Sequence, residues 1–143
     1  MKTIDETVQD LYAAISFVKG ETPNYGLLKD LFIPDAKLIN NNGDQPLIFN
    51  IDSFIDSLKE NLANKVFESI FEIEIAYKTD LFGKIAHRFS TYEFRFNPND
   101  ENPYTIGINS IQLIQVGNQW KVTSIAWNDQ RPGLEIPENY LLM

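Results

Sequence analysis

The sequence predicts an α+β fold in which N-terminal helices pack on a strongly curved, mostly antiparallel sheet. Apolar residues recur at helical spacing in the first third of the chain, and four long runs with strand character follow from residue 67 onward. The last two runs, 105–116 and 119–128, are joined by Gly117-Asn118, a two-residue turn typical of an antiparallel hairpin. Helices that precede consecutive strands indicate an α+β domain.

Two helices are expected before the first strand. The first begins after Thr3, whose hydroxyl can cap an exposed backbone amide, and ends at Gly20. A short second helix, near residues 25–32, stops before Pro34, because proline disfavours helical backbone at the residue that precedes it. The buried stripe of the first helix comprises Ile4, Val8, Leu11, Tyr12, Ile15 and Val18.

A small hairpin and a third helix are expected next. Residues 36–39 can form one short strand and residues 47–49 its partner. The sequence Asn-Asn-Asn-Gly-Asp over residues 40–44 predicts the turn between them, since Asn and Gly tolerate positive φ. The third helix then runs from about 52 to 63, with Asp52 as its cap.

The run 67–78 alternates between apolar and charged residues, which indicates a strand with one buried face and one wet face. We interpret its glutamates Glu68, Glu72 and Glu74 as the solvent-exposed face, with a metal site or a paired acid and base as the alternative. The run 84–96 differs, because apolar residues occur on both of its faces. A polar loop over residues 97–103 separates it from the final hairpin.

Length and composition indicate one folded domain. The 143 residues suit a single domain over residues 1–143, and we expect residues 132–143 to form a C-terminal tail that crosses a surface and can extend over a partner. Apolar residues make up 43% and aromatic residues 13% of the chain, which is too much apolar surface for a disordered protein.

Charge and residue usage exclude several classes of function. A formal charge of −8 repels a phosphate backbone, so no nucleic-acid partner is expected. No apolar run approaches the roughly 20 residues that cross a bilayer, and the N-terminus lacks the apolar core of a signal peptide. We therefore expect no membrane partner and a cytoplasmic location. With no cysteine, one histidine, no P-loop and no dinucleotide fingerprint, we expect no metal and no cofactor.

Apolar residues on both faces of the last strands suggest a second role for the sheet. One face would line the interior, and the other would meet a second copy of the chain in a homodimer. The alternative is that the outward aromatic residues are scattered over a monomer surface, which is common in soluble proteins.

The order of elements resembles the nuclear transport factor 2-like superfamily, also called the cystatin-like α+β cone, over roughly residues 3 to 133. A short helix ending in Leu31-Phe32-Ile33-Pro34-Asp35-Ala36, a hairpin, a helix and four long strands carry the resemblance. The segments from 107 to 113, from 117 to 122 and from 125 to 129 look like the small, mostly uncharacterised bacterial SnoaL-like proteins. The resemblance implies a cone-shaped roll whose open end holds a ligand pocket, usually in a dimer, and it implies no particular activity.

Enzymes of this superfamily allow the catalytic positions to be compared. In the isomerases the general base is an aspartate a few residues after an Asp-Ala pair, and this chain places Asn40 at about that point. A carboxamide cannot accept a proton at neutral pH, which argues against isomerase chemistry. Asp35 matches the common Asp-Ala position and is a pocket candidate, with a structural role at the helix-to-strand turn as the alternative. Superfamily dehydratases use histidines, an aspartate and tyrosines, but a second histidine is absent here.

The remaining candidates are His87 and several polar strand residues. His87 is the one side chain that ordinarily titrates near neutrality, so it is the candidate catalytic acid or base, with a core or interface role as the alternative. Polar or amphipathic groups where strands would otherwise be apolar suggest a pocket lining. These pocket candidates are Tyr12, Asp35, Ser90, Tyr92, Asn109, Ser110 and Trp127. Asn109 and Ser110 should face opposite sides, and so should Trp120 and Trp127 on an unbulged strand.

Three functions follow as hypotheses. The first is a small-molecule-binding protein that holds an apolar or aromatic ligand in the cone without established chemistry. The second is a cofactor-independent lyase, isomerase or cyclase in which His87 transfers a proton. The third is a dimeric protein-interaction module.

Overall fold

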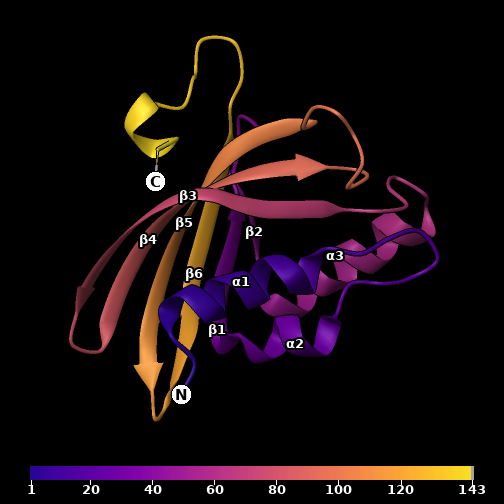
Figure 1. Cartoon of the computed structure of the whole chain (residues 1–143). Coiled ribbons are helices and arrows are strands. Elements are labelled where there is room, and N and C mark those ends of the chain that lie inside the picture. The colour runs from indigo at the N-terminus through magenta and orange to yellow at the C-terminus, as the bar shows by residue number, and fades with distance from the viewer. Residues whose placement is uncertain (143) are drawn as a thin grey trace.

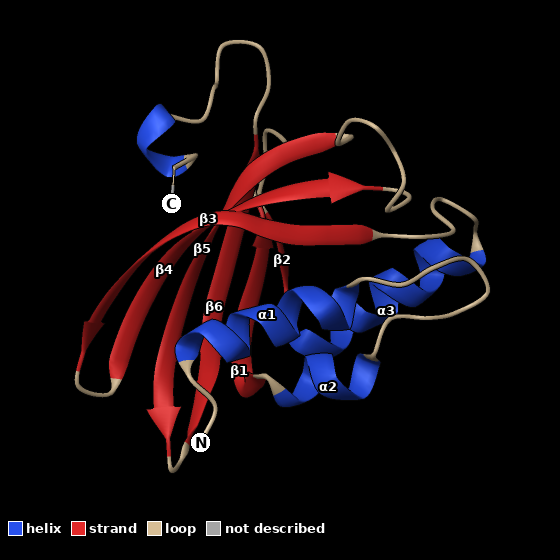
Figure 2. Ribbon diagram, viewed as in Figure 1, coloured by secondary structure: helices blue, strands red, loops and turns tan. Residues whose placement is uncertain are grey.

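The computed structural model describes residues 1–142 and confirms the α+β class. Three helices lie on one face of a curved, open sheet (Figures 1 and 2). They are α1 (Ile4–Ile15), α2 (Tyr25–Asp30) and α3 (Ile51–Ala63). The strands are β1 (Phe32–Asn40), β2 (Leu47–Phe49), β3 (Phe71–Phe82), β4 (Ile85–Arg95), β5 (Thr105–Val116) and β6 (Gln119–Asp129). Within residues 1–142, no helix combines the length and apolar character needed to span a bilayer.

The sheet has the strand order β2-β1-β6-β5-β4-β3. All neighbouring pairs are antiparallel except β1 and β6, which run parallel. Gly117, in the turn of the final hairpin, has a φ of +59°, a conformation that glycine adopts without steric cost. That hairpin forms with the expected boundaries, except that β6 extends one residue further to Asp129.

Helix α1 begins as predicted and ends earlier than predicted. Thr3 and Glu6 form a reciprocal capping box at its first turn. The helix ends at Ile15 rather than at Gly20, because the Ser16 hydroxyl donates to the Tyr12 carbonyl and also bonds to the β3 backbone at Glu72. Val18, predicted in the buried stripe, lies beyond this end and is exposed.

The elements around α3 also differ from the prediction in detail. Its cap is Asn50, which forms a capping box with Ser53, so Asp52 lies inside the first turn. Strand β1 is longer than expected and includes Pro34. Its register with β6 shifts between Phe32 and Lys37, an irregularity that accommodates a residue with no backbone N–H to donate.

Strand β3 corrects the interpretation of the glutamates as a solvent-exposed face. It starts at Phe71, four residues later than predicted, and its register with β4 shifts between Glu74 and Ala76. Before this bulge, Glu72 and Glu74 lie on the face toward the helices, and the Glu74 side chain is only 2% exposed. Glu68 precedes the strand and is exposed. The interpretation is therefore wrong for Glu72 and Glu74.

The core fills the space between the helices and the inner face of the sheet. It contains Val8 and Leu28 from the helices and Leu38, Ile111 and Val122 from the strands. Trp120 belongs to this core and Trp127 packs against it, so both tryptophans lie on the inner face. A register shift near Thr123 explains this, because one extra residue reverses the alternation that an unbulged strand would have.

The C-terminal segment lies against the outer face of the sheet, opposite the helices (Figure 1). A short 3₁₀ helix, η1 (Glu138–Tyr140), ends there. The Tyr140 carbonyl accepts a hydrogen bond of 2.6 Å from Thr91, and its ring packs on Phe89. Within residues 132–142 the expected tail thus folds back onto its own β4, while Met143 lies outside the described residues.

Candidate functional site

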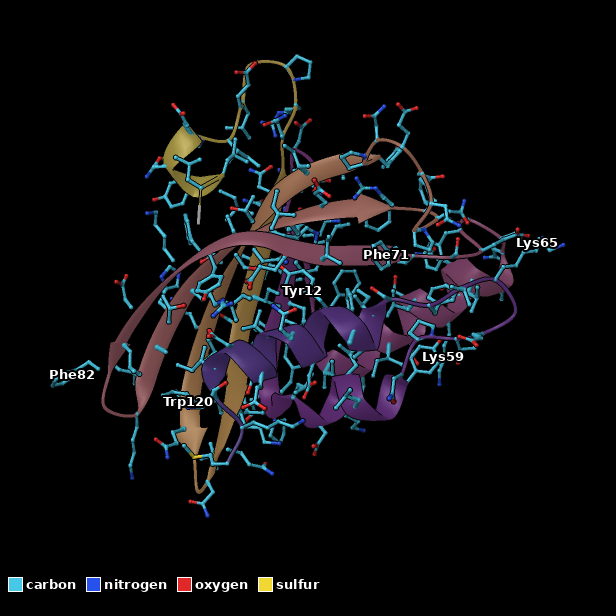
Figure 3. The ribbon with its side chains drawn as sticks, in the orientation of Figure 1. Tyr12, Lys59, Lys65, Phe71, Phe82 and Trp120 are labelled. Carbon is cyan, nitrogen blue, oxygen red and sulfur yellow. The ribbon has the colours of Figure 1, made fainter. Side chains whose placement is uncertain are left out.

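A cavity of about 400 Å³ lies between the three helices and the inner face of the sheet. Most of its wall is apolar, and side chains from α1, α3 and five strands or their flanks contribute aromatic rings. Tyr12 projects into this space from α1 toward the strands (Figure 3). The aromatic lining residues are Tyr12, Phe32, Phe54, Phe67, Tyr92, Phe94, Phe96, Tyr104 and Trp127.

The polar groups of the cavity come mainly from the strands. Glu72 on β3 and Asp129 at the end of β6 supply two carboxyl groups. Asparagines supply carboxamides from the end of β1, the turn after it, α3 and β5; they are Asn40, Asn42, Asn61 and Asn109. The wall therefore combines aromatic rings with acids and amides, which is the make-up of a small-molecule site.

Asp129 is held by groups from two other segments. The Tyr92 hydroxyl donates to Oδ1 of Asp129, and Nδ2 of Asn42 donates to Oδ2 at 3.0 Å. The Asp129 backbone N–H in turn donates to Oδ1 of Asn42 at 2.6 Å. Gly107 makes room for this arrangement, because a Cβ at that position would overlap the Tyr92 hydroxyl.

Glu72 is the acid whose protonation the cavity perturbs most clearly. Burial raises the pKa of Glu72 from 4.5 to about 7, and the charge of Asp129 adds to the increase, while a hydrogen bond with Asn109 opposes it. The carboxyl is therefore about half protonated at neutral pH. A group in this state can accept or donate a proton and can bind a cation as it ionises.

Tyr12 belongs to a hydrogen-bonded chain whose direction is fixed by a buried ion pair. Arg88 and Glu74 form this pair, and neither side chain is more than 2% exposed. The Ser90 hydroxyl donates to Oε2 of Glu74 at 2.5 Å, so the Ser90 oxygen must accept the hydrogen bond that the Tyr12 hydroxyl donates across 2.6 Å. Nδ2 of Asn109 then donates to the Tyr12 oxygen at 2.9 Å.

The two tyrosines of the polar region are therefore neutral and already engaged. Burial raises the pKa of Tyr12 and of Tyr92 above the usual value, and the carboxylates nearby act in the same direction. The Tyr12 proton points to Ser90 and the Tyr92 proton to Asp129. Tyr92 can therefore offer a ligand only the acceptor side of its oxygen, and the Tyr12 oxygen already accepts from Asn109.

The structure brings together four of the seven predicted pocket residues: Tyr12, Tyr92, Asn109 and Trp127. Ser90 is buried one hydrogen bond behind Tyr12 and is absent from the lining. Asp35 is exposed on β1, away from the cavity wall. Ser110 faces the outer side of β5, opposite Asn109 as the alternation predicts.

His87, the predicted catalytic residue, lies on the outer face of β4. Its Nε2 is 3.1 Å from the Ser110 hydroxyl, and its ring packs on Phe89. Residues that line the cavity occupy the other face of the same strand, including Tyr92 and Phe94. His87 does not contribute to the cavity wall.

Neither cavity acid is among the pocket residues predicted from the sequence. Glu72 shares its strand face with Glu74, and Asp129 follows the predicted end of the last strand by one residue. The neighbouring strand β4 carried one signal for interior acids. Arg88 shares a strand face with Ser90 and Tyr92, and an arginine on an interior face requires an acidic partner. Among residues 1–142, no group of three or more His, Cys, Asp or Glu side chains could hold a metal ion.

Sequence comparisons identify no relative: no family model matches the chain, and no curated protein matches it. Solved structures do match. LinA superposes with a TM-score of 0.67 at 11% identity, covering 90% of this chain and 84% of LinA. A protein of unknown function with a cystatin-like fold from Nostoc punctiforme has a TM-score of 0.65 at 14% identity, covering 90% and 93%.

A third match carries the fold name itself. An NTF-2-like protein of unknown function from Silicibacter pomeroyi has a TM-score of 0.60 at 14% identity, covering 89% of this chain and 92% of that one. The chain has the nuclear transport factor 2-like fold. The expected superfamily resemblance is thereby confirmed at the level of fold. At these identities the nuclear transport factor 2-like fold is shown, and the activity is not.

Proposed function

We propose that this nuclear transport factor 2-like protein binds a small, largely apolar molecule in the cavity beneath its helices. One observation carries the proposal: a cavity of about 400 Å³ with nine aromatic lining residues and with polar groups that include Glu72 and Asp129. Apolar walls supply affinity through burial, and a few fixed polar groups orient the ligand.

The test uses a neutral aromatic probe, N-phenyl-1-naphthylamine, whose fluorescence rises in apolar surroundings. We expect saturable binding of one probe per chain, with quenching of Trp127, which lines the cavity. Trp127→Phe should remove most of the ligand-dependent change in protein fluorescence. Trp120→Phe is the matched control, because Trp120 lies in the core and not in the cavity wall. Absence of saturable binding would contradict the proposal.

Proton transfer is a second candidate function, and Glu72 now supports it better than His87 does. Its raised pKa of about 7 keeps both protonation states available inside the cavity. A neutral ketone such as 4-phenyl-2-butanone in D₂O provides the assay, because exchange of its α-protons reports proton abstraction. Glu72→Gln should lower the exchange rate, whereas His87→Gln should not. Exchange no faster than with buffer alone would count against this function.

A homodimer remains a proposal for the outer face of the sheet. On β5, Ile106 and Ile108 alternate with buried inner residues and are half-buried in the single chain. A second copy packed by twofold symmetry would cover them. Sedimentation velocity at micromolar concentration tests this, with Ile108→Lys expected to shift a dimer toward monomer. A monomeric wild-type protein would overturn the proposal.

A further inference from the structure

The ionisable side chains of the cavity wall give it one sign of charge. Glu72 and Asp129 are its carboxyl groups, and no lysine, arginine or histidine contributes to the wall formed by the described residues 1–142. Arg88, the basic side chain of the hydrogen-bond network behind Tyr12, is fully buried and forms ion pairs with Glu74 and Asp5. An anionic ligand would thus meet acids with no cation to compensate them.

Hydrogen-bond direction gives a second, independent indication. The Tyr12 proton points to Ser90 and the Tyr92 proton to the Asp129 carboxylate, so neither proton is free for a ligand. The direction at Tyr12 follows from the Arg88–Glu74 ion pair and from Ser90, which lie outside the cavity wall, and the direction at Tyr92 follows from Asp129. The Tyr92 oxygen therefore presents an acceptor to a ligand, as the two carboxylates do, and a ligand that donates hydrogen bonds fits best.

The aromatic walls are compatible with a cation. Aromatic faces attract ammonium groups, and such contacts are strongest where water is excluded. Tyr12 and Tyr92 border the acids, and Trp127 occupies the same wall. A ligand with an apolar body can bury that body against the rings while its charged end stays with the carboxylates.

We infer that the cavity takes an apolar organic amine in its protonated form, with the ammonium group between Glu72 and Asp129. This inference rests on the proposed binding function and adds the chemical class of the ligand. The ammonium would donate to both carboxylates, and the hydrocarbon or aryl part would occupy the apolar remainder of the cavity.

The inference requires a particular dependence on pH. The titratable groups that face Glu72 are Tyr12 from α1, Tyr92 from β4 and Asp129 from β6, with Glu74 two residues along its own strand. The raised pKa values of both tyrosines leave them neutral between pH 6 and 8. Glu72, with a pKa of about 7, gains charge across this range. Amine affinity should therefore rise from pH 6 to pH 8.

The experiment compares three ligands of matched shape: 4-phenylbutylamine, 4-phenyl-1-butanol and 4-phenylbutyrate. Each competes with N-phenyl-1-naphthylamine for the 143-residue protein at pH 6, 7 and 8. At pH 8 we expect the amine to bind at least about tenfold more tightly than the alcohol, since a close charge pair in a partly buried site readily supplies that factor. The carboxylate should bind most weakly.

Two variants that remove one carboxylate each separate a local effect from net charge. Glu72→Gln should reduce the ratio of amine to alcohol affinity about tenfold at pH 8 and flatten its pH dependence. Glu68→Gln is the matched control, because Glu68 is exposed and does not line the cavity. It should leave the ratio unchanged.

Proton release gives a readout on the wild-type protein that needs no variant. Calorimetric titration of the amine at pH 7, in phosphate and in Tris, should show release of about half a proton, since Glu72 is half protonated there. The alcohol should release none.

The outcomes distinguish the two proposals. If the naphthylamine probe binds but the alcohol binds as tightly as the amine, or the carboxylate binds best, the amine assignment is overturned and the binding function stands. If neither the probe nor any of the three compounds binds, the proposed function itself fails. If amine affinity does not change between pH 6 and 8 and no proton is released, the role of Glu72 is overturned.

Discussion

Two glutamates on β3 have the same chemistry, the same strand face and different environments. Glu74 pairs with Arg88, accepts a hydrogen bond from the Ser90 hydroxyl and is almost fully buried. Glu72, two residues earlier, borders the cavity beside Asp129, and no basic side chain lies in the cavity wall among the described residues. Burial, to which the charge of Asp129 adds, raises the pKa of Glu72 to about 7.

The difference separates a structural acid from a candidate functional one. A buried carboxylate with an arginine and a hydroxyl has its hydrogen-bonding capacity used by the protein. A desolvated carboxyl without a neighbouring cation is unstable in its charged form, and a proton or a cationic ligand can stabilise it. Glu74 thus helps to hold α1, β3 and β4 together. Glu72 remains available in the cavity to exchange a proton or to bind a cation.

The largest expected effect is the loss of the structural pair. Arg88→Met should lower the free energy of unfolding by about 3–5 kcal/mol, because Glu74 would remain as an unpaired buried charge. Urea denaturation measures it. The double variant Arg88→Met/Glu74→Gln should recover part of the loss. Lys29→Met is the control, since its pair with Asp52 is exposed and contributes at most about 1 kcal/mol. A loss below 1 kcal/mol for Arg88→Met would contradict the structural role.

The second effect concerns Glu72 and depends on pH. The folded-state pKa of about 7 exceeds the ordinary 4.5, so the folded protein binds more protons than the unfolded chain between these values. Stability must then fall as pH rises through this window, by about 2–3 kcal/mol between pH 4.5 and pH 8. Glu72→Gln should remove this contribution. Urea denaturation at pH 5, 6, 7 and 8 should show the variant becoming relatively more stable than wild type as pH rises; parallel curves would refute the assignment.

A third prediction tests the frame around Asp129. Gly107→Ala should destabilise the protein by about 1–3 kcal/mol, because the added Cβ overlaps the Tyr92 hydroxyl and lies 2.7 Å from the Asn128 carbonyl oxygen. It should also weaken probe binding, since Tyr92 must move away from Asp129. Gly26→Ala, in α2, is the control and should cost nothing measurable, because its added Cβ would meet only Oδ1 of Asn24, at an ordinary contact distance of 3.9 Å. Thermal unfolding and probe titration check both; equal stability of the two variants would argue against the close packing.

Local signals predicted much of the fold. Thr3 capped α1, and Gly117-Asn118 closed the last hairpin, because both depend on residues close in sequence. Bulges were not predicted, since nothing local marks the register shifts after Glu74 or near Thr123. Their effect is large, because one extra residue reverses which face each later side chain occupies.

The candidate site was predicted only in part, because its acids also depend on contacts that are distant in sequence. Tyr12, Tyr92, Asn109 and Trp127 stood out as polar or amphipathic residues in otherwise apolar elements. Glu72 did not, because a charged strand face ordinarily indicates solvent. Only the folded structure shows that the Arg88 side chain binds Glu74 on that face and that α1 packs over it. Tertiary packing decides whether a row of glutamates on a strand is exposed to solvent or buried.

The smallest expected effect concerns Ser90, which connects the buried ion pair to the cavity wall. Ser90 is the link between the Arg88–Glu74 pair and Tyr12, so Ser90→Ala should cost about 1–2 kcal/mol of stability. It should also free the Tyr12 proton to turn toward the cavity, which would then offer a donor. The preference for 4-phenylbutylamine over 4-phenylbutyrate should narrow by severalfold, without the loss of pH dependence that Glu72→Gln causes. Ser110→Ala, on the outer face beside His87, should leave that preference unchanged. A preference equally insensitive to both serines would mean that hydrogen-bond direction does not set ligand choice, and that the carboxylates act alone.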